Sequence, residues 1–349
     1  MADRATSKSA ISATDDYHAP HDLDTLGIFV LLDEELNTMR SLIRDCISND
    51  FTPLIADVGE HIFNAGGKYL RPALTLATSR LCDNTTPRQK SIVLSAAVEL
   101  IHNATLLHDD VVDNSSLRRG RISANHMWGN KPPVLVGDYL FSCAFQLMVK
   151  SENLRCLEIL AQASSVIASG EILQLTSVNN LDLSSESYFQ IIRAKTAALF
   201  SAASQVGGVV TSASPEHIEK LKDFGENLGM AFQLVDDILD YSETSSVLGK
   251  KRGDDFKDGK VTLPVLLAFQ RATDKEKIFW KRCFEDVHQA DEDLEHAIDQ
   301  LKSLGIFHDI RLSAFEYTSK AHDCLLAFPE SKVREELFEL IAYCTNRKF

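Results

Sequence analysis

The chain has 349 residues, of which 44% are hydrophobic and 25% are charged, as is ordinary for a soluble globular protein. Its formal net charge of −14 argues against nucleic-acid binding, because a surface that follows a phosphate backbone needs an excess of Lys and Arg. The seven cysteines show neither a CxxC pair nor regular spacing, which indicates reduced thiols and argues against a disulfide framework or a zinc site.

Residues 1–24 are polar and acidic, without the Arg-rich character of a transit peptide or the apolar core of a signal peptide. We expect a flexible N-terminal arm here and one all-α domain over residues 25–349. No apolar run is expected to cross a membrane, since even residues 92–107 are interrupted by Glu99, His102 and Asn103. The sequence therefore predicts a soluble, cytoplasmic protein without a transmembrane segment.

From Leu26 onward, apolar residues recur at helical spacing and no alternating, β-rich stretch appears. A single large helical bundle is therefore the expected fold. Its main helices are predicted over residues 26–48, 53–64, 73–81, 92–107, 155–175, 187–211, 215–239 and 265–271, with another that begins at residue 134.

Residues 65–72 read Ala-Gly-Gly-Lys-Tyr-Leu-Arg-Pro and lead into a helix. Glycines before a helix let the backbone approach an anion, which the positive end of the helix dipole favours. Lys68 and Arg71 add two cations three residues apart. This turn is expected to bind phosphate.

The apolar helix over residues 92–107 runs into three aspartates: Asp109, Asp110 and Asp113. Asp109 and Asp113 are one helical turn apart, so their carboxylates share a face at about 6 Å. Carboxylates at a helix C-terminus repel one another and meet the negative end of the dipole, so such a cluster needs cations. Hard oxygen ligands of this kind suit Mg²⁺, which usually completes its shell with water and substrate phosphates.

The same arrangement recurs at Asp236, Asp237 and Asp240, again at the end of an apolar helix. Two such clusters on either side of a central cavity could hold several Mg²⁺ ions around one diphosphate. Cations that could bind phosphate follow each cluster, and Arg suits this role because it grips phosphate through two nitrogens. They are Arg118, Arg119 and Arg121 after the first cluster, and Lys250 and Lys260 after the second.

Together these segments resemble the trans-isoprenyl diphosphate synthases, most closely the bacterial long-chain members that make octaprenyl diphosphate. The resemblance covers residues 28–345 and rests on both aspartate motifs and the Gly-Gly-Lys turn. The turn departs from the frequent family pattern at Tyr69, where Arg is common. Other matching segments are residues 136–139, 170–174, 195–196 and 259–264.

The resemblance implies roles for individual residues. The metal ligands would be Asp109, Asp110, Asp113, Asp236, Asp237 and Asp240, which hold about three Mg²⁺ ions, with Mn²⁺ as a substitute. The allylic diphosphate would contact Arg118, Lys195, Thr196, Gln233, Lys250 and Lys260. Isopentenyl diphosphate would contact Lys68, Arg71, His102 and Arg119. Asp109, Asp113, Asp236, Lys195 and Arg118 would be central to catalysis.

The implied reaction is head-to-tail condensation of an allylic diphosphate, such as farnesyl diphosphate, with successive isopentenyl diphosphates. The product would be an all-trans chain of about C40 for a quinone side chain, and the enzyme would be a homodimer. Small residues at Ala104 and Thr105 leave room for a long product below Asp109. The expected tunnel continues past Ile101 toward Met148 and Leu160.

Three other readings stay open. A class I terpene cyclase shares the all-α fold, but it needs neither a second complete aspartate motif nor the cations at Lys68 and Arg71. A non-catalytic subunit of a heteromeric synthase would usually lack intact acidic motifs. A shorter-chain synthase, making C15–C20 products, would need a floor closer to Asp109.

Overall fold

The computed structural model describes residues 26–48, 51–83, 88–242 and 252–346. The proposed arm at residues 1–24 and the predicted diphosphate ligand Lys250 lie outside the described residues. Within them the main helices that surround the site are α2 (Asp33–Ile47), α3 (Pro53–Asn64), α4 (Leu70–Cys82), α5 (Gln89–Val112), α7 (Lys131–Lys150), α8 (Leu154–Leu175), α10 (Ala198–Val210), α11 (Pro215–Leu239), α16 (Ile306–Leu325) and α17 (Lys332–Asn346). The shorter helical elements are α1 (Gly27–Leu31), α6 (Ala124–Trp128), α9 (Ser185–Ile192), the π-helix η2 (Arg193–Ala197), α12 (Asp254–Lys257), α13 (Leu263–Arg271), α14 (Asp274–Phe284) and α15 (Asp293–Ser303).

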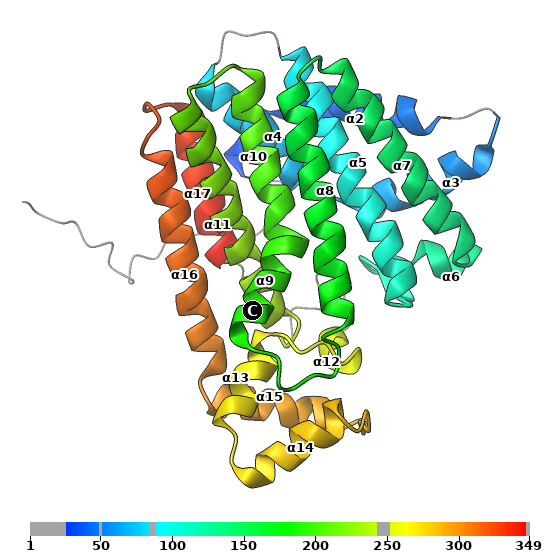
Figure 1. Cartoon of the computed structure of the whole chain (residues 1–349), viewed down its shortest axis with the longest axis vertical. Helices are drawn as coiled ribbons and strands as arrows, with labels where there is room; N and C mark the ends of the chain where they lie inside the picture. Colours follow the sequence, from blue (N-terminus) through cyan, green and yellow to red (C-terminus); the bar gives the residue numbers. More distant parts are fainter. Residues whose placement is uncertain (1–25, 49–50, 84–87, 243–251, 347–349) are drawn as a thin grey trace, which may run out of the picture.

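The long helices form a bundle, as expected. Figure 1 shows α8, α10, α11 and α16 side by side, with α13, α14 and α15 gathered at one end. α10 is at the centre, because nearly all of its residues are buried and it packs against α4, α8 and α11. The all-α prediction is confirmed.

Glycines allow the central helices to approach closely. A Cβ atom at Gly207 of α10 would lie 2.6 Å from the Thr75 carbonyl oxygen of α4. A Cβ at Gly225 of α11 would lie 2.4 Å from the Phe200 carbonyl oxygen of α10. Any larger residue would force these helices apart, so the bundle around the cavity depends on both glycines.

Most predicted helices are confirmed, and α3 and α11 have the predicted bounds. The helix expected over residues 26–48 is interrupted at Leu32, between α1 and α2. The helix expected over residues 187–211 contains the π-helical turn η2 between α9 and α10. Neither break involves Pro, so helical spacing of apolar residues could not show them.

Two short strands, β1 (Leu117–Arg118) and β2 (Arg121–Ile122), form an antiparallel hairpin that was not predicted from the sequence. The two residues between them, Arg119 and Gly120, have φ angles of 51° and 75°. A two-residue turn with positive φ at both positions suits the twist of a hairpin. Within the described ranges these are the only strands, and each is too short to leave a period-two pattern.

The expectation that no apolar stretch is long enough to cross a membrane is wrong in terms of length and composition. The helices α5, α7 and α8 are each long and apolar enough to cross a membrane by these two criteria. In α5, however, 78% of the most apolar window is buried inside the protein. α5 is apolar on nearly all sides because other helices surround it, and its few polar residues hardly lower the mean hydropathy. The corresponding windows of α7 and α8 are only 44% and 33% buried.

Candidate active site

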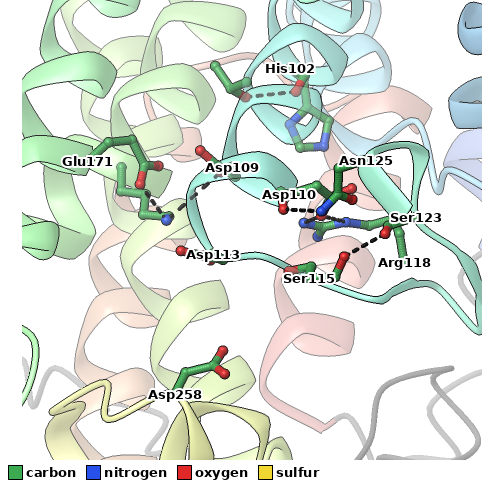
Figure 2. A network of polar contacts seen from close by, with 12 residues as sticks. His102, Asp109, Asp110, Asp113, Ser115, Arg118, Ser123, Asn125, Glu171 and Asp258 are labelled. Atoms are coloured by element: carbon green, nitrogen blue, oxygen red, sulfur yellow. Dashed lines mark hydrogen bonds and ion pairs between the residues drawn. The ribbon is translucent and has the colours of Figure 1, made fainter. Parts of the chain in front are cut away.

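The end of α5 places Asp109 on the wall of a cavity of about 390 Å³. Its Oδ2 atom lies 3.9 Å from Nζ of Lys195, which donates a hydrogen bond to Oε2 of Glu171 at 2.6 Å. Burial raises the pKa of Asp109, and the charges of Lys195 and Arg118 oppose that shift. Figure 2 shows Asp109 on the side of α5 that faces Glu171. Asp109 and the cation Lys195 therefore lie side by side on the cavity wall.

Asp110 points the other way and is 1% exposed. Its carboxylate forms an ion pair with Arg118 of the hairpin, whose Nε donates at 2.8 Å, and its backbone oxygen accepts from Asn125 of α6. Figure 2 shows this group on the opposite side of the helix end from Asp109. In this structure the Asp110 carboxylate thus anchors the hairpin, and Arg118 is occupied by it.

Asp113 is the residue at the C-terminal cap of α5. It accepts a hydrogen bond at 2.9 Å from Nζ of Lys260, which follows α12. Burial alone would lower the pKa of Lys260, but the carboxylates of Asp255 and Asp113 outweigh burial and hold this pKa above its ordinary value. The loop after the second motif is thereby tied to the end of the first.

In the second motif only Asp236 and Asp240 line the large cavity. Asp237 is 2% exposed and accepts hydrogen bonds from the Tyr188 hydroxyl at 2.6 Å and from Nε2 of Gln233 at 2.7 Å. Burial, with the nearby charge of Asp255, raises the pKa of Asp237 to about 7. This carboxylate lines a second cavity of about 200 Å³, whose wall also includes Asp236.

The two motifs lie near one another in space although they are far apart in the chain. Both Asp109 and Asp236 line the large cavity, as do Lys195 and Gln233. Asp240 also reaches this wall, and its Oδ2 accepts from the backbone N–H of Asp255 at 3.2 Å. Two groups of acidic side chains therefore face one space, as the sequence predicted for a central cavity.

The predicted pair Lys195 and Thr196 lies on the π-helical turn η2. A Cβ at Gly170 of α8 would come within 3.0 Å of the Lys195 backbone nitrogen, so α8 packs directly on this turn. Thr196 donates a hydrogen bond to Oε1 of Gln233 at 2.7 Å. Together they form a polar wall beside Asp236.

The wall of the large cavity also carries basic residues. It includes all four residues predicted to hold isopentenyl diphosphate: Lys68, Arg71, His102 and Arg119. Nη1 of Arg71 lies 3.2 Å from Nε2 of His102, and burial together with the charge of Arg71 holds the pKa of His102 well below 6.5. His102 is therefore neutral near pH 7 and can accept a hydrogen bond from Arg71.

The residues predicted to line a product tunnel separate into two groups. Thr105 lines the large cavity. Ala104, Ile101, Met148 and Leu160 are at most 1% exposed and lie in the hydrophobic core instead of on the cavity wall. The apolar part of the wall comes from Leu106, Phe232 and Leu239, together with Leu70.

The model of the polyprenyl synthetase family matches residues 52–301 of the chain. The chain belongs to the polyprenyl synthetase family. This polyprenyl synthetase is 37% identical to octaprenyl diphosphate synthase of Escherichia coli (strain K12) over 314 residues, which make up 90% of this chain and 96% of that protein. It is therefore a trans-prenyltransferase.

Solved structures agree with this assignment. A decaprenyl diphosphate synthase from Rhodobacter capsulatus aligns with a TM-score of 0.88 and 47% identity over 94% of this chain and 99% of that one. A polyprenyl synthase from Caulobacter crescentus CB15, complexed with calcium and isoprenyl diphosphate, aligns with a TM-score of 0.90 and 43% identity over 94% and 98% of the two chains.

The donor set of this polyprenyl synthetase fits a hard divalent cation that is completed by other ligands. Asp109, Asp113 and Asp236 offer carboxylate oxygens, the ligands that Mg²⁺ and Ca²⁺ prefer. In the part of the chain that the structure describes, no three His, Cys, Asp or Glu side chains gather closely enough to form a complete metal site. Mg²⁺ rarely has a dedicated all-protein cage, so water and substrate phosphates would supply the remaining ligands.

Sequence reasoning did not assign a role to several residues at the site. Glu99 lines the large cavity, and the only signal was a buried charge inside an apolar helix. Glu171 was noted only as part of a matching segment, although it bonds Lys195. Tyr188 and Tyr343 gave no signal, since they reach Asp237 and Lys68 from distant parts of the chain.

Proposed function

We propose that this prenyltransferase is a Mg²⁺-dependent enzyme that condenses farnesyl diphosphate with successive isopentenyl diphosphates to all-trans octaprenyl diphosphate. The C40 product would supply the side chain of a quinone. The observation that supports this most directly is a single cavity whose wall carries Asp109 and Asp236 from the two aspartate motifs together with the cations Arg71 and Arg119.

The aspartates of the two motifs suit the allylic diphosphate. Asp109, Asp113 and Asp236 would hold Mg²⁺ there, while Asp110, Asp237 and Asp240 support them from buried positions. In this structure Lys195 pairs with Glu171, and Lys260 pairs with Asp113. Bound Mg²⁺ would compensate the negative charge of these carboxylates in place of the lysines. Both lysines would then be free to turn to the diphosphate beside Thr196 and Gln233, and Arg118 would join them by leaving its ion pair with Asp110.

Four residues on the cavity wall suit the diphosphate of isopentenyl diphosphate as ligands: Lys68, Arg71, His102 and Arg119. This diphosphate remains attached to the growing chain, so it needs charge and orientation but no leaving-group activation. Arginines in a fixed geometry can hold it through paired hydrogen bonds. The neutral His102 keeps Arg71 oriented toward the cavity.

The residues of the site perform distinct parts of the reaction. Lys195 and Lys260 would bind the allylic diphosphate and stabilise the charge that develops on it as the C–O bond breaks. Bound Mg²⁺ would supply further positive charge to that leaving group. The alkene of isopentenyl diphosphate attacks the resulting carbocation, and the released diphosphate would accept the proton whose loss completes the new C5 unit. Burial of the site excludes the water that would otherwise capture the cation.

The proposed length of C40 rests on two observations. The relative from Escherichia coli is an octaprenyl diphosphate synthase. The residue on the cavity wall one turn above Asp109 is the small Thr105, so no aromatic side chain from α5 closes the space at that level.

We also propose that the enzyme acts as a cytoplasmic homodimer. Large apolar side chains are exposed on α7 and α8, among them Leu135 (67%), Val149 (64%), Leu154 (79%) and Ile172 (65%). Several large apolar side chains exposed on two neighbouring helices suggest a contact surface, since large exposed apolar patches mark interaction sites. A second copy of the chain would cover these faces of both helices through an interface in which each copy contributes the same surface.

The product assay tests this function. Purified protein is incubated with Mg²⁺, farnesyl diphosphate and labelled isopentenyl diphosphate, and chain length is measured after dephosphorylation. We expect products centred on C40, no incorporation in EDTA, and a loss of about 100-fold or more in kcat for Asp109→Ala, because the metal would lose a ligand where leaving-group charge develops.

Other outcomes would change the proposal. Products of C15–C20 would show a shorter-chain synthase and refute the octaprenyl assignment. Full activity of Asp109→Ala would refute the metal-ligand assignment. Absence of any incorporation by the folded wild-type protein would indicate a non-catalytic subunit that needs a partner chain.

A further inference from the structure

Glu99 is a buried carboxylate on the wall of the large cavity, which it shares with two arginines. It is 3% exposed and lies on α5, ten residues before Asp109, and it lines the cavity with Arg71 and Arg119. A carboxylate in a pocket that must bind a diphosphate opposes the ligand by its charge. None of the roles assigned above requires it.

The surroundings of Glu99 place it at the diphosphate-binding turn itself. A Cβ at Gly67 would lie 3.7 Å from Oε1 of Glu99 and 3.3 Å from Nη1 of Arg119. The backbone of the Gly-Gly-Lys turn thus passes directly beside both charges. A diphosphate bound by this turn and by Arg119 would come close to the Glu99 carboxylate.

Glu99 is held by a neutral hydrogen bond and not by an ion pair. Nδ2 of Asn103, one turn along α5, donates to Oε1 of Glu99 at 2.9 Å. Among the described residues no Lys or Arg nitrogen lies within 4.0 Å of this carboxylate. The charge of Glu99 therefore interacts with the arginines through space, while its position is set by Asn103.

Several charged or titratable groups face Glu99 from the elements around it. They are Arg40 from α2, Tyr69 from the turn, Arg71 from α4, Arg119 from the hairpin and His102 on α5 itself, while the neutral Asn103 donates its hydrogen bond. Burial raises the pKa of Glu99 to about 7, although Asn103 and the arginines oppose this shift. Burial and Glu99 also raise the pKa of Tyr69, so Tyr69 stays neutral.

We propose that Glu99 adjusts the charge of this pocket: it balances Arg71 and Arg119 before substrate binds, and it takes up one proton from solvent when a diphosphate binds there. The proton removes the repulsion between the Glu99 carboxylate and the diphosphate. The charges of Arg71 and Arg119 then interact with the ligand alone. Glu99 is in this sense a positioning residue that acts through Arg71 and Arg119. The inference rests on the proposed function, in which this pocket binds isopentenyl diphosphate.

The sign of the pH dependence follows from this exchange. If binding needs protonated Glu99, affinity is highest below pH 7 and falls by about tenfold per pH unit above it, because a proton must be taken up from an ever lower concentration. The terminal phosphate of the ligand loses its last proton at about pH 6, so between pH 7.5 and 8.5 the ligand itself contributes little to the proton balance. Raised pH should therefore increase KM for isopentenyl diphosphate and leave kcat at saturation unchanged.

Calorimetry on the wild-type protein tests the proton directly. Isopentenyl diphosphate is titrated into the protein at pH 8.0 with EDTA, which disables the metal-dependent part of the site, in buffers of different ionisation enthalpy. We expect uptake of about one proton per ligand bound. Binding without proton uptake would overturn the inference and leave the proposed function intact.

Variants then assign the proton to Glu99. Glu99→Gln keeps an oxygen that can accept from Asn103 and imitates the protonated state. Its KM for isopentenyl diphosphate should change less than about twofold between pH 7.5 and 8.5, whereas the wild-type KM should rise about tenfold. Glu99→Asp, which keeps the charge, should retain the wild-type slope.

Glu35→Gln is the matched control, because Glu35 is equally buried but pairs with Arg80 and Arg88 away from the cavity. The KM slope of this control should equal that of the wild type. An unchanged slope in folded Glu99→Gln would refute the assignment to Glu99. Absence of both binding and incorporation in the wild type would refute the proposed function, and the inference with it.

Discussion

Neighbouring residues in each aspartate motif face in different directions. Asp109 reaches the cavity while Asp110 pairs with Arg118, and Asp236 reaches the cavity while Asp237 accepts from Tyr188 and Gln233. Successive positions on a helix are separated by about 100°, so two adjacent aspartates point in different directions and can meet different partners. Each motif therefore combines a cavity-facing carboxylate with one that fixes the surrounding structure.

At the scale of single residues, Thr105 should control product length. Thr105→Phe would place an aromatic ring on the cavity wall, and the product of the assay above should become shorter by several C5 units. Ala104→Phe is the comparison, because Ala104 is 0% exposed in the core. Overpacking there should lower the free energy of unfolding by about 1–3 kcal/mol.

Chain length after dephosphorylation and thermal unfolding separate these two effects. An unchanged product from Thr105→Phe would show that the chain grows along another path. Thr105→Val serves as the control with nearly the same volume, and its product should match that of the wild type.

At the scale of elements, the site depends on a π-helical turn. An extra residue in one helical turn interrupts the regular hydrogen bonds, and such turns are frequent at functional sites. Here η2 carries Lys195 and Thr196 between α9 and α10, and it packs against glycines of two other helices. A Cβ at Gly229 of α11 would lie 2.7 Å from Cα of Ala197, and one at Gly170 of α8 would lie 2.7 Å from Cβ of Ala194.

Gly170→Ala should therefore displace the turn that carries Lys195. We expect kcat to fall about 10- to 100-fold, because small displacements of a catalytic group are costly. The free energy of unfolding should fall by about 1–3 kcal/mol. Steady-state kinetics and denaturant unfolding measure both quantities.

Gly59→Ala provides the control for this substitution. Gly59 is in helix α3, and an added Cβ would meet only the Ile47 side chain, at 3.3 Å. Activity should stay near that of the wild type, since α3 contributes no residue to the cavity. Equal activity of Gly170→Ala would contradict the proposed packing of α8 on η2.

At the scale of the whole molecule, the outer faces of α7 and α8 are more apolar than expected for a bundle that exists as a monomer. Their most apolar windows are mostly outside the core, whereas that of α5 is mostly inside. A face of this kind is stable in water only when it is small or covered. The proposed homodimer provides such a cover.

The double variant Leu135→Glu with Val149→Glu should dissociate the dimer. Both side chains are exposed on α7, so the monomer loses little packing, while two buried charges in each half of an interface would be strongly unfavourable. Light scattering after size-exclusion chromatography should show a fall from about twice the chain mass to the mass of one chain.

Leu312→Glu is the control, because Leu312 is also exposed (51%) but lies on α16. It should leave the mass unchanged. A wild-type protein that is monomeric at micromolar concentration, or a double variant that stays dimeric, would contradict the proposed interface.

Much of the molecule could be predicted from local patterns in the sequence. Helical spacing is a local property, so α3 and α11 were predicted with their observed bounds, and the all-α class followed. Both aspartate motifs could be recognised as candidate metal sites because each follows a long apolar helix with aspartates one turn apart. The turn with Lys68 and Arg71 could likewise be predicted as an anion site, since glycines before a helix let backbone N–H groups approach an anion.

Only the tertiary structure decided which partners these residues meet. Tyr188 bonds Asp237 across 49 positions of the chain, and Lys68 bonds Tyr343 across 275. The direction of Asp110, the burial of Ala104 away from the cavity and the place of Glu99 among arginines likewise depend on helices that are remote in sequence. The sequence by itself determined which chemistry the chain carries, because residue type and spacing are local. Tertiary packing decided which charges face one another, because these contacts arise only when distant helices meet.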